Sequence, residues 1–245
     1  MVYNRLIMKN KIIFWLRQQV RQAGAKGIIL GLSGGIDSAV VAALSKQSVG
    51  SNRLLALLMP IHSHPSDLED AKIMARKFGI TTKTVDLSGI YDSFVKLLPP
   101  AGKLARANLK PRLRMVTLYY FANQLNYLVC GTGNRTELMA GYFTKYGDGG
   151  VDVLPLGDLF KNEVRALAKE LLIPEQIITK PPTAGLWPGQ TDEGEMGMSY
   201  PVLDGILERM ADKKSQIAGK SKVDKVKKMV EQSEHKRQGP AICFI

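Results

Sequence analysis

Residues 27–44 read Gly-Ile-Ile-Leu-Gly-Leu-Ser-Gly-Gly-Ile-Asp-Ser-Ala-Val-Val-Ala-Ala-Leu, and this stretch decides the fold class. The apolar run 28–32 predicts a strand that is buried on both faces of a parallel sheet. Ser33-Gly34-Gly35 predicts a turn where backbone can approach a ligand closely, because the two glycines have no Cβ. From Asp37 onward the apolar spacing and the alanines predict a helix. A strand, a glycine turn and a helix N-terminus in direct succession favour an anion site, and we expect phosphate or pyrophosphate there.

The residues of this turn point to a metal-assisted phosphate site. An ordinary P-loop carries a lysine after its glycines, and that lysine reaches the outer phosphates. Here the carboxylate Asp37 stands at that point, flanked by the hydroxyls of Ser33 and Ser38. A carboxylate beside phosphate repels it unless a hard cation lies between them, so Asp37 predicts Mg²⁺. The alternative is a glycine-rich strand–helix turn with no ligand, and the match of six loop residues in the right context argues against it.

Strand and helix patterns alternate along the rest of the chain. Strands are expected over 53–59, 80–86 and 127–132, and helices over 5–23, 66–78, 115–126, 159–171, 201–210 and 212–232. Such alternation predicts an α/β fold with a doubly wound, mostly parallel sheet, helices on both faces, and ligands at the carboxyl ends of the strands. No internal repeat or linker is visible, so we expect a single domain over 1–245.

Composition limits the classes of protein. The net charge of +12, from 34 basic and 22 acidic residues, suits a nucleic-acid-binding protein or an enzyme with two polyphosphate ligands. Two cysteines cannot make a disulfide framework, and a reducing compartment is the default. Lysines and arginines interrupt the N-terminal apolar runs, which excludes a signal peptide, and no stretch approaches the roughly 20 apolar residues of a membrane helix. We therefore expect a soluble, cytoplasmic protein.

A basic run precedes the helix expected over 115–126. Residues 104–114 carry four cations, and Pro111 suits the first turn of that helix. A solvated basic face is the usual fate of such a run. Arg112 and Arg114 lie two residues apart, on different faces of a helix, so at least one of them can point inward to hold carboxylate or phosphate. The sequence alone supports a solvated basic face and an inward-pointing arginine equally well.

The strand expected over 127–132 repeats the design of the first one. It contains Cys130, which we expect to be a small core residue, and it opens into a polar helix start that includes Glu137. Two such strand ends can converge on one ligand, with Glu137 as a second carboxylate for the cation inferred from Asp37. A first-turn glutamate favoured by the helix dipole explains Glu137 equally well. Lys161 lies in the first turn of another expected helix, where the dipole disfavours cations, so we expect it to face phosphate.

Several further segments have weaker signals. Residues 141–152 are rich in glycine and aromatic residues, which indicates an ordered, functional loop. Residues 179–200 have no period and indicate a lid or a disordered loop. The lysine-rich helix over 212–232 is more easily a solvated charged face than a nucleic-acid surface. His62 and His64 could share a face and hold a metal, but surface loop histidines are the better interpretation.

Together these segments resemble the ammonia-dependent NAD synthetases, a family of N-type ATP pyrophosphatases with a fold like that of the adenine nucleotide alpha hydrolases. The resemblance extends over nearly the whole chain and is carried by residues 31–38, 108–114, 131–150, 156–162, 180–186 and 235–237. It implies an enzyme without a glutaminase domain that uses free ammonia. Such an enzyme amidates deamido-NAD (nicotinic acid adenine dinucleotide) to NAD through an acyl-adenylate, releasing AMP and pyrophosphate.

The resemblance also implies roles for individual residues. ATP would contact Gly31, Leu32, Ser33, Gly34, Gly35, Ile36, Asp37, Ser38, Thr132, Lys161 and Thr183. Asp37 and Glu137 would hold Mg²⁺, and Asp37 and Lys161 would be the catalytic residues. Deamido-NAD would be bound by Arg112, Lys145, Asp152, His235 and Lys236, at the interface of a homodimer.

Two rival functions remain open at this level. One is another enzyme with the same phosphate loop, such as a tRNA-modifying member, which the charge of +12 would suit. Its sulfur-transferring members generally need paired catalytic cysteines, whereas Cys130 lies in a strand and Cys243 near the chain end. The other is a basic nucleic-acid-binding protein without activity, which leaves Asp37, Glu137 and the glycine turns without purpose. We expect neither nucleic acid nor membrane as a partner.

Overall fold

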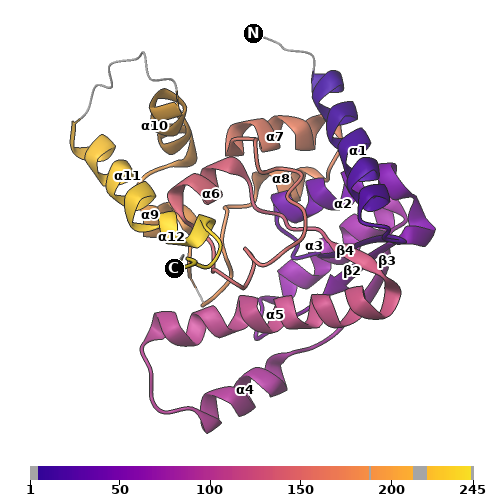
Figure 1. The fold of residues 1–245 in the computed structure, drawn as a ribbon, viewed down its shortest axis with the longest axis horizontal. Coiled ribbons are helices and arrows are strands. Elements are labelled where there is room, and N and C mark those ends of the chain that lie inside the picture. Colours follow the sequence, from indigo (N-terminus) through magenta and orange to yellow (C-terminus); the bar gives the residue numbers. More distant parts are fainter. Residues whose placement is uncertain (1–4, 188, 212–219, 244–245) are drawn as a thin grey trace.

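Four parallel strands form the centre of the computed structural model, which describes residues 5–187, 189–211 and 220–243. Their bounds are β1 Gly27–Gly31, β2 Leu54–Leu58, β3 Thr81–Thr84 and β4 Tyr127–Val129. The strands lie in the order β3-β2-β1-β4, and every neighbouring pair is parallel (Figure 1). Because the chain moves outward from β1 first to one edge and then to the other, the sheet is doubly wound, as the sequence predicted.

Helices cover both faces of this sheet, and the side chains of β1 alternate between them. Ile28 and Leu30 belong to the larger core cluster, whereas Ile29 belongs to a cluster that also contains Leu118. The larger cluster includes residues of α1 Arg5–Gln22, α2 Ile36–Val49, α3 Pro65–Phe78, α7 Lys161–Glu170 and α8 Glu175–Thr179. The opposite face packs against α4 Ser88–Leu97 and α5 Lys103–Leu125 (Figure 1). The expected helices on both faces are confirmed.

A second group of helices packs beside the sheet around its own apolar cluster. It consists of α6 Arg135–Ala140, α9 Asp192–Met196, α10 Tyr200–Ala211, α11 Lys220–Gln232 and α12 Glu234–Arg237, at the left of Figure 1. Val223 and Val226 of α11 are buried in this cluster, so the lysine-rich side of the helix faces outward. The first part of the helix expected over 212–232, residues 212–219, lies outside the described residues.

Helix α5 begins earlier than the sequence predicted. It runs from Lys103 rather than from residue 115, so the basic run is helical and Pro111 lies in the helix interior instead of in its first turn. An interior proline removes one backbone hydrogen bond and costs about 3 kcal/mol. Packing offsets that loss, because Pro111 is buried and the backbone at Gly147 approaches it so closely that an added Cβ would lie 3.0 Å away.

Helices α4 and α8 were not predicted from the sequence, and the remaining differences from the predicted elements are small. Helix α7 starts at Lys161 rather than at residue 159, because the Glu163 carboxylate accepts a hydrogen bond from the Phe160 N–H and fixes the helix start there. The loop expected over 179–200 contains α9, and a short 3₁₀ helix, Ser51–Arg53, precedes β2. In the part of the chain that the structure describes, no helix is long and apolar enough to cross a membrane.

Candidate functional site

The glycine turn between β1 and α2 is held by its own serines. The Ser33 and Ser38 hydroxyl oxygens lie 3.0 Å apart, the Ser33 N–H donates to Ser38 Oγ, and the Gly35 N–H donates to Ser33 Oγ. Gly34 has φ +82°, and an added Cβ there would lie 2.2 Å from the carbonyl oxygen of Asp67. Only glycine fits this position, because the turn passes directly against the start of α3.

Asn134 joins this turn to the second strand end. Its side-chain oxygen accepts from the Glu137 N–H at 3.0 Å, and the Glu137 carboxylate accepts in return from the Asn134 N–H, so the pair caps α6. The Asn134 amide group also donates to Asp37 Oδ1 at 2.8 Å. Glu137 therefore lies in the first turn of α6, as one interpretation of the sequence had it, and its capping role is a finding of the structure; the predicted convergence of the two strand ends is correct as well.

Lys161 lies between the two carboxylates. Its ammonium group is 2.6 Å from Asp37 Oδ2 and 3.0 Å from Glu137 Oε1, and only 2% of the residue is exposed. The sequence predicted a lysine that faces phosphate. In the structure it forms a buried ion-pair network with the residues that were expected to hold the cation.

Burial and charge act against each other in this cluster. Burial disfavours the ammonium form of Lys161, but Asp37 and Glu137 outweigh it, so the pKa of Lys161 is raised above its usual value. Burial also raises the pKa of Glu137, with Lys161 acting against this rise and the nearby Asp37 charge adding to it. Glu137 therefore binds a proton more readily than an exposed glutamate, and a second cation at the site would oppose that protonation.

Two residues that the sequence reasoning missed position Lys161. The Thr136 hydroxyl accepts from the Lys161 N–H at 3.0 Å and donates to Asp204 Oδ1 at 2.6 Å. The other carboxylate oxygen of Asp204 accepts from the Asn162 N–H at 3.0 Å, so a buried carboxylate serves the N-terminus of α7. Asp204 sits next to Leu203 on the apolar stripe of a predicted helix, and an acid in such a stripe is the signal that would have found it.

A second acidic group lies on the other side of Lys161. The Lys161 ammonium is 4.8 Å from the centre of the Tyr200 ring, and the Tyr200 hydroxyl donates to the buried Asp192 carboxylate at 2.8 Å. The Tyr142 hydroxyl also donates to Asp192. Burial raises the pKa of Asp192, with the two tyrosine hydrogen bonds and Lys161 acting against that rise. Helices α9 and α10 thus complete the wall around the lysine.

The other residues expected at ATP are less closely tied to this cluster. Gly31, Leu32 and Ile36 belong to the turn and its flanks, and Thr132 directly follows the parallel bridge between Cys130 and Val153. Thr183 is exposed in the segment after α8, where its hydroxyl accepts from the Gly185 N–H. Among the described residues, no hydrogen bond joins the Thr183 side chain to the turn.

Four of the five residues expected at deamido-NAD form one group. The Lys145 ammonium donates to the carbonyl oxygens of His235 and Gln238, and Arg112 donates to the Lys145 carbonyl at 3.4 Å. The Lys236 ammonium donates to the carbonyl oxygens of residues 141 and 143, in the same loop. This group joins the outer side of α5 to α12.

The fifth residue, Asp152, lies apart from them. Its carboxylate accepts from the Tyr119 hydroxyl and from the Val129 N–H, both at 2.8 Å, so it is held against α5 and the end of β4. Tyr119 is two helical turns beyond Arg112 along α5. The contacts therefore do not unite Asp152 with the other four residues within one chain.

The two histidines have other partners. His62 Nε2 lies 2.9 Å from Asp92, and the His64 side chain caps α3, where the sequence had suggested no role. Among the described residues no group of three or more histidine, cysteine or acidic side chains is placed to hold a metal ion. Asp37 and Glu137, the pair that the sequence predicted as metal ligands, lie together at the strand ends with Lys161 between them.

The fold and site define a doubly wound α/β protein with a glycine turn at the carboxyl edge of its parallel sheet, beside an acidic pair that a lysine neutralises. The NAD synthase family model matches residues 8–240. The chain therefore belongs to the NAD synthase family.

Individual relatives agree with this assignment. The chain is 50% identical over 243 residues to an NH(3)-dependent NAD(+) synthetase of Carboxydothermus hydrogenoformans, with 96% of each chain covered. It is 49% identical to one of Archaeoglobus fulgidus, over 96% of this chain and 95% of that one. Among solved structures, an NMN synthetase of Francisella tularensis has a TM-score of 0.91 at 34% identity, over 99% of this chain and all of the other. An NH3-dependent NAD synthetase of Campylobacter jejuni has 0.84 at 31% identity, over 98% and 100%.

Proposed function

We propose that this protein converts deamido-NAD to NAD with ATP and free ammonia, releasing AMP and pyrophosphate. The observation that carries the proposal is the meeting of Asp37, Glu137 and Lys161 beside the glycine turn, in a chain of the NAD synthase family. The triphosphate of ATP would lie on the turn and at the N-terminus of α2, where backbone N–H groups and the helix dipole favour anions. The proposed unit is one domain over 1–245.

The reaction needs the carboxylate to be activated first, because oxide is too poor a leaving group for ammonia to displace. A carboxylate oxygen of the nicotinate attacks the α-phosphorus of ATP, and the bond to pyrophosphate breaks. Ammonia then attacks the acyl carbon, AMP leaves, and the nitrogen loses a proton to solvent. The chain contributes positioning and positive charge, which Lys161 and the N–H groups of the turn supply.

Asp37 and Glu137 would hold Mg²⁺. Two carboxylates together with substrate phosphates and waters are the oxygen ligands that this cation usually takes. Each carboxylate is fixed by Asn134 on one side, so both are already oriented toward the same point. When bound, the ion would neutralise charge on the phosphates. Without the ion, the Lys161 ammonium would balance the negative charges of Asp37 and Glu137.

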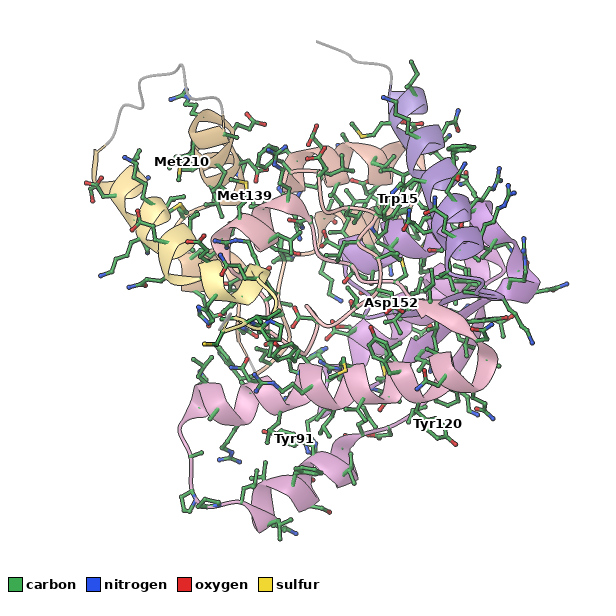
Figure 2. All side chains as sticks on the ribbon, in the orientation of Figure 1. Trp15, Tyr91, Tyr120, Met139, Asp152 and Met210 are labelled. Carbon is green, nitrogen blue, oxygen red and sulfur yellow. The ribbon has the colours of Figure 1, made fainter. Side chains whose placement is uncertain are left out.

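We assign the dinucleotide to the group formed by Arg112, Lys145, His235 and Lys236, together with Asp152 across a homodimer interface. Support for the dimer comes from the outer surface of α4 and α5. This surface, including the turn between the two helices, exposes seven large apolar residues: Ile90, Phe94, Leu97, Leu98, Leu104, Val116 and Tyr120. Figure 2 shows Tyr120 on the side of α5 that faces away from the sheet. A surface of this kind is typical of a protein–protein interface.

The decisive experiment is an incubation of the purified protein with Mg-ATP, deamido-NAD and an ammonium salt. NAD and AMP formed in equal amounts are the expected result. Replacing Mg²⁺ by a chelator should stop both products, and sedimentation velocity should give twice the mass of one chain. Binding of ATP without NAD formation would leave the phosphate site intact and refute the proposed acceptor.

A smaller acceptor, nicotinic acid mononucleotide, is the second candidate. It is favoured by the likeness to the Francisella tularensis NMN synthetase, since an NMN synthetase would form the same amide on a mononucleotide. The relatives at 49–50% identity favour the dinucleotide. Comparison of kcat/KM for the two acids under identical conditions decides between them.

The two other candidate functions predict different ligands. A tRNA-modifying enzyme would form a salt-sensitive complex with tRNA, and a nucleic-acid-binding protein would bind no Mg-ATP. We propose neither, and we place the activity in the cytoplasm, where ATP is available.

A further inference from the structure

Arg237, the last residue of α12, joins the ends of two other helices. Its Nη1 group donates to the carbonyl oxygens of Leu138 and Met139, at 3.0 and 3.1 Å, in the last turn of α6. Its Nη2 group donates to the carbonyl oxygen of Val230 at 2.6 Å, in the last turn of α11. The last carbonyl groups of a helix have no partner within the helix, and a cation there complements the helix dipole. One guanidinium group therefore caps the carboxyl ends of both α6 and α11.

Ser233 and Lys236 hold the same junction. The Arg237 Nη1 group also donates to Ser233 Oγ at 2.9 Å, and Ser233 is buried. Gly141, which follows α6, approaches Ser233 so closely that an added Cβ would overlap the serine side chain. The Lys236 ammonium donates to the carbonyl oxygens of Gly141 and Phe143, at 2.8 and 3.0 Å. The end of α6 is therefore fixed relative to α12.

The opposite end of α6 carries residues of the candidate site. The helix has only six residues, about 9 Å at 1.5 Å per residue, and Asn134 and Glu137 lie in its cap and first turn. Leu138, whose carbonyl oxygen accepts from Arg237, directly follows Glu137 in the chain. A shift of the end of α6 therefore moves the Glu137 carboxylate relative to the Lys161 ammonium, which lies 3.0 Å from it.

The residues that precede Arg237 belong to the group assigned to the dinucleotide. His235 and Lys236 lie in the same short helix, and the Lys145 ammonium donates to the carbonyl oxygen of His235. Arg237 thus connects the residues assigned to the dinucleotide with the helix that carries Glu137.

We propose that Arg237 is a positioning residue for the reaction. By holding the end of α6 against α12, it sets the distance between the Glu137 carboxylate and the residues that hold the dinucleotide. It acts through Glu137 and α12 rather than on the reacting atoms. Only a planar guanidinium group donates in several fixed directions at once, as the acceptors on α6 and α11 require. The inference rests on the proposed function for the identity of the substrate.

Steady-state kinetics of an Arg237→Ala protein test the proposal. The kcat should fall about 10- to 100-fold, because a displacement of about 1 Å at a reacting centre has an effect of this size. The KM of deamido-NAD should rise about 10-fold, since the loosened side chains of α12 must then be ordered on binding. The KM of ATP at saturating Mg²⁺ should stay the same, because among the described residues no hydrogen bond of Arg237 reaches the glycine turn.

Arg17→Ala is the matched control, because Arg17 makes the same kind of contact far from the site. It is also exposed, and it donates to the carbonyl oxygens of Gln47 and Ser48, both at 2.9 Å, in the last turn of α2. This turn lies about 20 Å along α2 from the glycine turn. Arg17→Ala should lower the Tm about as much as Arg237→Ala does, but kcat and both KM values should not change. Equal kinetic defects in the two variants would overturn the proposal, because lost stability alone would explain them.

Guanidinium ion should restore the activity of the Arg237→Ala protein. Because Arg237 is exposed, a guanidinium ion from solution can take the place of its side chain and donate to the same carbonyl oxygens. Guanidinium chloride at millimolar concentration, far below the denaturing range, should raise kcat severalfold, whereas potassium chloride at equal ionic strength should not. A kinetic defect that guanidinium leaves unchanged would overturn the role of the guanidinium contacts.

Hydrogen exchange separates this inference from the proposed function. Amides of residues 135–143 should exchange about tenfold faster in Arg237→Ala than in the wild type, and Arg17→Ala should leave them unchanged. If the wild type forms no NAD, the proposed reaction is refuted, and faster exchange that guanidinium reverses still supports the role of Arg237 in holding α6. Unchanged exchange of these residues in Arg237→Ala overturns the inference whether or not NAD is formed.

Discussion

Replacing Lys161 with methionine should destabilise the protein by about 3 kcal/mol at pH 8, because two largely buried carboxylates lose their shared cation. Lys161 makes two charge-assisted hydrogen bonds, at 2.6 and 3.0 Å, each worth about 1.5–3 kcal/mol. Their sum is an upper bound, because methionine keeps an apolar stem against Tyr200. In addition, one proton shared by Asp37 and Glu137 relieves part of their repulsion.

The stability that the Lys161→Met protein loses relative to the wild type should be smaller at pH 6 than at pH 8. Burial raises the pKa of Glu137 from 4.5 to about 7 even though Lys161 acts against the rise, and removal of Lys161 raises it further. A carboxyl group with a higher pKa in the folded state binds more protons there than in the unfolded state. Stability therefore falls as the pH rises from the unfolded pKa, near 4.5, through the raised folded value. As the pH rises from about 4.5 to 7, the free energy of unfolding of the variant should therefore fall. Near pH 7 it should fall more steeply than that of the wild type, because the pKa of Glu137 is higher in the variant.

Urea unfolding at pH 6 and pH 8, followed by far-UV circular dichroism, measures both effects. Lys169→Met is the matched control, because Lys169 is exposed in the last turn of the same helix, and it should change stability by less than about 0.5 kcal/mol. A Lys161→Met protein as stable as the wild type at both pH values would refute the ion-pair reasoning. An equal loss at both pH values would refute the proton-sharing part.

Three further predictions follow from the site and the core. Asp37→Asn should keep the hydrogen bond from Asn134 but lose the one from Lys161, which costs about 1.5–3 kcal/mol, and it should slow pyrophosphate release about 10²- to 10³-fold; unchanged turnover at limiting Mg²⁺ would contradict the metal role. Gly34→Ala should lower the free energy of unfolding by more than about 2 kcal/mol, because the residue has φ +82° and its new Cβ would lie 2.2 Å from a backbone oxygen. An unchanged calorimetric Tm would contradict the turn geometry. One of the two thiols should react with a disulfide reagent at pH 8 in the native protein, because Cys243 is exposed while burial raises the pKa of Cys130 to about 12; two fast-reacting thiols would contradict that burial.

The sequence predicted the parts of the fold that depend on local signals. The strand, turn and helix over 27–44 were readable because apolar runs, glycines and alanines each act within a few residues. The α5 start was missed because Pro111 suggested a helix beginning, and only the close approach of Gly147 explains how an interior proline is accommodated.

The site was predictable as a set of residues but not as a set of contacts. Asp37, Glu137 and Lys161 were all named from the sequence, yet the ion pair among them depends on strands that are distant along the chain. Thr136 and Asp204 were missed because their partners lie 25 to 68 residues away. No local pattern specifies such a pairing. The roles of Arg112, Lys145 and His235 in holding the substrate stay predictions.

The ion pair between Asp37 and Lys161 also sets the order in which the protein can mature during synthesis. Asp37 and Lys161 are 124 positions apart, whereas Glu137 and Lys161 are only 24 apart, so Asp37 leaves the ribosome well before the ammonium group and Glu137 only shortly before it. Contacts of such long separation form late, because the intervening chain must be ordered first. A nascent chain that has already formed the glycine turn therefore carries Asp37 without its cationic partner until α7 docks.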